Sequence, residues 1–67
     1  MKSYTLKFWR KAKAPHTTPR LLGDTVVRDV PDTTRETELC GHYEGFANIF
    51  LRGELGPVDF VTCEELP

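Results

Sequence analysis

The chain has 67 residues, of which 39% are hydrophobic, and its nine Lys and Arg side chains nearly balance ten Asp and Glu. At this length only one domain is possible, and about 60% of the unfolded surface is buried on folding. Such a thin core argues against a self-contained catalytic pocket, and the aromatic content argues against disorder, so we expect one non-enzymatic domain over residues 1–67 with no cofactor.

The first predicted element is a β-strand over residues 3–11. Apolar and polar side chains alternate there with a period of two, which is typical of a strand with one buried face. The two predicted faces hold Tyr4, Leu6 and Phe8 on one side and Thr5, Lys7 and Trp9 on the other.

Residues 12–23 are predicted to form a long loop, because Pro15 and Pro19 remove backbone donors and favour extended geometry before them. A second strand is expected over residues 25–30. In that strand Val26 and Val30 would share one face and Val27 would lie on the other, and the following proline would end it.

A helix is predicted over residues 34–43. Thr33 and Glu36 have the spacing of a capping box, in which each side chain bonds the backbone N–H near the other. Acidic residues in the first turn also suit the positive end of the helix dipole. The side chains expected to be buried are Leu39, Cys40 and Tyr43.

The end of this helix has two interpretations. Gly45 favours termination there, since it is suited to a left-handed helix end. Residues 46–52 then form a third strand, with Ala47, Ile49 and Leu51 facing the helix and Phe46 and Phe50 on the side that Trp9 shares. The alternative is one helix to Arg52, in which Gly41 and Gly45 each cost roughly 1 kcal/mol.

A turn over residues 53–57 and a fourth strand over residues 58–63 complete the prediction, with Val58 and Phe60 on one face. We expect an α+β fold, a small two-layer β-β-α-β-β domain with an antiparallel sheet and one helix. The alternatives are β-β-α-β with the longer helix and a small five-stranded barrel.

The two cysteines, Cys40 and Cys63, are expected to be reduced and partly buried, because secreted chains of this size carry more disulfides. With His16 and His42 they could supply zinc ligands. The only closely spaced pair is Cys40 and His42, whose side chains point apart on a helix, so we expect no metal. No signal peptide or membrane span is apparent, and a cytoplasmic location is expected.

The charges are segregated along the chain. Residues 1–20 carry six cations and no acid, and residues 21–67 carry three cations and ten acids, or 3 − 10 = −7. Cations around Trp9 are typical of a surface that binds phosphates and bases, although the acidic remainder opposes a polyanion. The predicted partner-binding residues are Lys7, Trp9, Arg10, Lys11, Lys13, Arg20 and Phe50.

The favoured function is a protein-binding module that occludes or adapts a larger protein. In size and layout the chain is similar to small phage-encoded inhibitors of host machinery, a likeness that includes no motif and assigns no residue roles. The alternative is a nucleic-acid-binding protein that uses the basic first strand and loop. A homodimer is a further option, because one sheet face would be uncovered and carry aromatic side chains.

Overall fold

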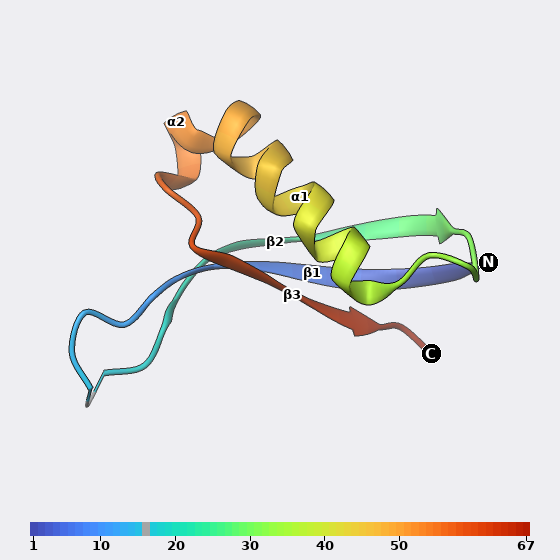
Figure 1. The fold of residues 1–67 in the computed structure, drawn as a ribbon, viewed down its shortest axis with the longest axis horizontal. Helices are drawn as coiled ribbons and strands as arrows, with labels where there is room; N and C mark the ends of the chain where they lie inside the picture. Colours follow the sequence, from blue (N-terminus) through green and yellow to red (C-terminus); the bar gives the residue numbers. More distant parts are fainter. Residues whose placement is uncertain (16) are drawn as a thin grey trace.

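The computed structural model describes residues 1–15 and 17–67, and the fold is of the α+β class. One long helix lies over one face of a three-stranded antiparallel sheet, and a short helix follows it (Figure 1). The elements in chain order are β1 Lys2–Arg10, β2 Arg20–Val30, α1 Glu36–Phe50, α2 Arg52–Leu55 and β3 Phe60–Glu65. The described chain therefore has three strands where four were predicted, and it forms no barrel.

Strand β1 is the centre of the sheet, whose order is β2-β1-β3. The predicted alternation along this strand is confirmed. Tyr4, Leu6 and Phe8 are buried beneath the helical layer, and no more than 4% of any of the three is exposed. Burial of each such side chain stabilises the fold by roughly 1.5–3 kcal/mol, which makes this face of β1 the centre of the core.

Strand β2 begins earlier than predicted and contains a bulge near its end. The pairing advances by two residues along β1, from Lys2 to Tyr4, and by three along β2, from Val30 to Val27. Asp29 takes up the extra residue with a φ of 59°, a left-handed conformation that Asp tolerates better than most residues. Val27 and Val30 consequently both face the core and Val26 is exposed, so the predicted division of the valines was wrong.

The beginning of α1 also differs from the prediction. The N–H of Thr34 donates to the carbonyl of Pro31 at 2.9 Å, which places this segment in a turn. The helix starts after Arg35, and no side chain caps it, so the predicted capping box does not form. The two acidic residues of its first turn, Glu36 and Glu38, are as expected.

Helix α1 continues through Gly45 to Phe50, so the longer helix was the better prediction and the third strand was wrong. Leu39, Tyr43, Ala47 and Leu51 recur every four residues, and all four contribute to the core. Burial of this continuous apolar stripe stabilises the longer helix. The stabilisation is larger than the cost of its internal glycines, which is roughly 1 kcal/mol each relative to alanine.

The residues between α1 and β3 form a short helix and a buried connection. The predicted turn is α2, which ends at Gly56 with a φ of 74°. Val58 is buried before the last strand begins, and β3 runs from Phe60 to Glu65, two residues later than predicted. The carboxamide of Asn48 bonds the backbone of Val58, joining α1 to this connection.

Candidate functional site

The sheet face opposite α1 carries the first candidate surface, and Trp9 lies on it. Directly paired residues of adjacent strands project to the same face, so Trp9 shares this face with its partners Leu21 and Phe60. The Trp9 and Phe60 rings are stacked, with centroids 6.1 Å apart and an interplanar angle of 9°. Lys7 lies two residues along the same face, paired with Asp24 and Thr62.

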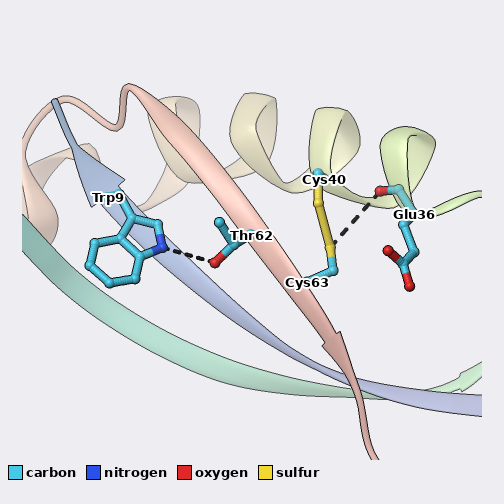
Figure 2. The surroundings of a disulfide bond; sticks show 5 residues. All are labelled: Trp9, Glu36, Cys40, Thr62 and Cys63. Carbon is cyan, nitrogen blue, oxygen red and sulfur yellow. Dashed lines mark hydrogen bonds between the residues drawn. A yellow bond between two sulfur atoms is a disulfide. The ribbon is translucent and has the colours of Figure 1, made fainter. Parts of the chain in front are cut away.

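The position of the Trp9 ring is set by a hydrogen bond. Its Nε1–H donates to Oγ1 of Thr62 at 2.9 Å, across from β1 to β3 (Figure 2). Because the indole nitrogen is the only polar atom of the ring, its remaining surface is an apolar π face. A cavity of about 460 Å³ next to this surface is lined by Trp9, Phe60, Thr62, Thr18 and Pro19.

Sequence reasoning missed Phe60 because it placed Phe60 on the same face as Val58. The strand begins only at Phe60, and within it the side chains of Val61 and Cys63 pack on the core. Phe60 and Thr62 therefore face the other way. The alternation of Phe60, Thr62 and Glu64 with Val61 and Cys63 was the signal that could have placed Phe60 beside Trp9.

The cations of the β1–β2 loop gather at the same end of the sheet. Strand β1 ends at Arg10, so Lys11 and Lys13 belong to the loop, and Arg20 begins β2. Together with Thr17 and Thr18 they line a cavity of about 250 Å³, to which Arg10 also contributes. Thr18 lines both this cavity and the aromatic one, so the two lie on either side of this residue. His16 of this loop lies outside the described residues.

Arg10 differs from the other predicted binding residues, since its guanidinium is engaged within the fold. Nε donates to the carbonyl of Pro57 at 3.3 Å, and Nη2 donates to the carbonyl of Leu55 at 3.1 Å. Leu55 is the last residue of α2. The structure thus gives Arg10 a role in holding the α2–β3 connection against β1.

Phe50 lies on α1, in the layer on the other side of the sheet from Trp9. The expectation that Phe46 and Phe50 share the side of Trp9 was wrong, because residues 46–50 are helical. Ile49 and Phe50 have 73% and 69% of their surface exposed, and Phe46 has 39%. Phe46 also contacts Phe50 and Tyr43, with centroid distances of 5.0 and 5.9 Å. We call Phe46, Ile49 and Phe50 the α1 patch.

An open groove adjoins the α1 patch, between the helix and β2. Its volume is about 550 Å³, and its walls include Val26 and Val27 from β2 and Tyr43, Phe46 and Leu51 from the helical side. The groove lies on the β2 side because the backbone of α1 is closest to β3, while its buried Leu39 and Ala47 pack on side chains of β1. Phe46 lines the groove and belongs to the patch, so the two form one apolar surface.

Cys40 and Cys63 form a disulfide, which corrects the prediction of reduced thiols (Figure 2). Their Cα atoms are 6.6 Å apart, and the bond joins the first half of α1 to β3. Disulfides persist in oxidising compartments and are rare in the cytosol, so cysteine usage no longer argues for a cytoplasmic protein. Within residues 1–15 and 17–67, no group of three or more His, Cys, Asp and Glu side chains could hold a metal ion.

The cations of the loop have no carboxylate partner in the described part of the chain. The two ion pairs found there join the N-terminus to Asp32, at 3.4 Å, and Lys2 to Glu65, at 3.2 Å. The hydrogen bond and charge of Glu65 raise the pKa of Lys2. Lys11 is near Asp59, but there the Asp59 carboxylate accepts a 2.7 Å bond from the Lys11 backbone N–H.

Neither helix in the described residues has the length and apolar run that a membrane span requires. No protein-family model, curated protein or solved structure matches the chain. The two candidate surfaces are therefore argued from their own geometry: the aromatic and basic face around Trp9, and the apolar α1 patch with its groove.

Proposed function

We propose that the chain is a non-enzymatic protein-binding module that occludes or adapts a larger protein through the α1 patch. The observation that carries this proposal is the exposure of Ile49 and Phe50 beside an open apolar groove. Contiguous apolar surface of this kind on a small domain is typical of interaction sites. Aromatic anchors at the centre of such a surface contribute most of the binding energy of an interface.

The geometry of the patch suits a partner with its own apolar ridge. Burying the exposed parts of Ile49 and Phe50 would contribute roughly 1–2 kcal/mol each, before the cost of association is subtracted. The groove beside them would accept a side chain from the partner, and Arg28 at its wall offers a polar contact at the rim.

A non-enzymatic role is supported by the chemistry of the groove lining. Among the described residues, its ionisable side chains are Arg28 and Tyr43, with no His, Asp, Glu, Lys or Cys in the lining. General acid–base catalysis near neutral pH most often uses His, Asp or Glu side chains. The side chains that line the groove therefore suit binding of a partner better than proton transfer.

Affinity capture with paired variants tests the proposal. Ile49→Asp with Phe50→Asp adds two charges to the patch, and Thr33→Asp with Thr37→Asp adds the same charge at exposed positions elsewhere. We expect the wild type and the threonine variant to capture the same protein, which then binds the purified chain directly. Equal capture by the aspartate patch variant, or failure of the purified pair to bind, would refute it.

A second copy of the chain is the simplest alternative occupant of the patch. Sedimentation of the wild type over a range of concentrations reveals a homodimer, and the aspartate patch variant abolishes it if the patch is the interface. The cytoplasmic location stays a prediction, and the disulfide is the observation that opposes it.

A further inference from the structure

The sheet face opposite α1 has two features that the α1 patch lacks: a flat aromatic surface and, at its loop end, cations that have no carboxylate partner among the described residues. Trp9 and Phe60 lie parallel, and the Trp9 nitrogen is already used by Thr62. What this surface offers a ligand is therefore a π face rather than a hydrogen bond. The cavity beside it, about 460 Å³, lies within the range of about 300–1,000 Å³ that small-molecule sites occupy.

The cations adjoin this surface through the loop. Thr18 lines both cavities, and Lys11, Lys13 and Arg20 line the second. Among the described residues that line these two cavities, none is acidic. Two acids lie further along the same face, Asp24 opposite Lys7 and Glu64 opposite Thr5 in the strand register, and the carboxylate of Asp59 accepts a hydrogen bond from the Lys11 backbone. The cations therefore lie at the loop end of the sheet, and the hollow that they line meets the aromatic one at Thr18.

We propose that this face binds single-stranded nucleic acid. An unpaired base would stack on Trp9, and the backbone phosphates on either side would contact Lys11, Lys13 and Arg20. Aromatic platforms beside cationic grooves are the usual construction of single-strand sites, because every base has a π face and every nucleotide a phosphate. A duplex fits poorly, since its bases are already stacked on one another and cannot reach the indole.

The number of loop cations sets the expected salt dependence. Each phosphate contact to a single strand contributes about −0.7 to the slope of log K against log salt concentration. Three contacts give a slope of about −2.1. Between roughly 50 and 200 mM salt the affinity should then fall about 20-fold.

Trp9 is the only tryptophan of the chain, so its fluorescence reports stacking directly. The probe is an oligothymidylate of about 12 nucleotides, a length within the range of roughly 4–16 that small single-strand folds cover. We expect saturable quenching at low salt and the 20-fold weakening at higher salt. Phe60→Leu removes the ring beside Trp9 rather than the stacking platform itself, so it should weaken binding by no more than about 5-fold, with circular dichroism to verify folding.

Charge-matched variants separate a specific surface from general attraction. Lys11→Gln with Lys13→Gln leaves one loop cation, and the salt effect should shrink from about 20-fold to about 3-fold. Arg35→Gln with Arg52→Gln removes the same charge from exposed positions on the helical side, and it should leave the slope unchanged. These surface changes do not touch the core, so they test the proposal even if the aromatic variant is unstable.

Four results would overturn the inference. These are no quenching at low salt, equal affinity for a duplex of the same length, equal quenching by polyglutamate, and an equal loss of slope in the arginine control. Polyglutamate binding would identify an acidic polypeptide as the ligand instead. The α1 patch variant with Ile49→Asp and Phe50→Asp should bind the oligonucleotide with the wild-type salt slope. The two proposals therefore concern separate surfaces, and loss of protein capture by this variant says nothing about oligonucleotide binding.

Discussion

The side chain of Asn48 and the backbone of Val58 form a reciprocal pair of hydrogen bonds. Oδ1 of Asn48 accepts from the Val58 N–H at 2.9 Å, and Nδ2 donates to the Val58 carbonyl at 3.0 Å. The same Nδ2 also donates to the carbonyl of Glu44 within α1. This pair joins the helix to the chain two residues before β3, and it therefore helps to set where Phe60 enters the sheet beside Trp9.

Asn48→Ala should lower the free energy of unfolding by about 1–3 kcal/mol. Val58 is buried, so the substitution leaves its N–H and carbonyl without a partner and away from water. Urea denaturation measures the change. Asn48→Asp keeps the acceptor for the Val58 N–H but places a carboxylate oxygen against the carbonyls of Glu44 and Val58, so near neutral pH we expect a loss at least as large as that of the alanine variant. An unchanged midpoint for the alanine variant would contradict the observed pairing.

Two glycine substitutions should shift stability in opposite directions. Gly45 is inside α1 with no atom near the position of a Cβ, so Gly45→Ala should stabilise the chain by about 0.5–1 kcal/mol. Gly56 has a φ of 74°, and a Cβ there would collide with the Arg10 guanidinium. Gly56→Ala should therefore cost more than about 1 kcal/mol.

The same urea experiment measures both glycine variants, and it also tests the helix boundary. If Gly45 ended the helix in a left-handed conformation, as one interpretation of the sequence has it, then Gly45→Ala would destabilise the chain. Stabilisation supports a continuous α1.

The errors in predicting the fold have long-range causes. The faces of β1 follow from local alternation, because in this central strand Tyr4, Leu6 and Phe8 all lie in core clusters with α1 residues. The bulge at Asp29 reverses the faces of β2, and periodicity gives no sign of it. The extension of α1 past Gly45 depends on the burial of Ala47 against Phe8 and Val58, which are distant in sequence.

Reduction of the Cys40–Cys63 bond should destabilise the protein by about 3 kcal/mol, because the bond closes a loop of 23 residues in the unfolded chain. For a domain of this size such a loss lowers the Tm by roughly 12–24 °C. Thermal denaturation with and without a phosphine reductant measures it.

Cys63→Ser is the matched control for the disulfide, since its Tm should not respond to reductant. Thiol titration of the denatured protein before reduction should find no free thiol. Two free thiols in the freshly purified protein would contradict the bond and restore the argument for a reducing compartment.

The candidate site was predicted in part. Lys7 and Trp9 lie on the face opposite the core, as alternation indicated, and the loop cations adjoin them. Phe60 was missed because Val58 and Asp59 were taken as regular strand, which put Phe60 on the face of the buried Val58. The strand begins only at Phe60, so the alternation does not extend back to Val58. The role of Arg10 could not be predicted, since its partners Leu55 and Pro57 are more than forty residues away in sequence.

Arg10 and Lys11 are adjacent cations that should respond differently to the same substitution. Arg10→Met keeps an apolar side chain but removes the donors to Leu55 and Pro57, so we expect a loss of about 1–3 kcal/mol in unfolding free energy. Lys11→Met should change stability little, because the Lys11 bond to Asp59 is made by its backbone N–H.

Oligonucleotide binding should show the reverse order. Lys11→Met should reduce the salt slope by about 0.7, the contribution of one phosphate contact, whereas Arg10→Met should leave it near the wild-type value. Titration of both variants at two salt concentrations, below their unfolding midpoints, compares them directly. An equal loss of slope in Arg10→Met would mean that its guanidinium leaves the α2–β3 connection to contact the ligand. The hydrogen bonds to Leu55 and Pro57 would then belong only to the unbound protein.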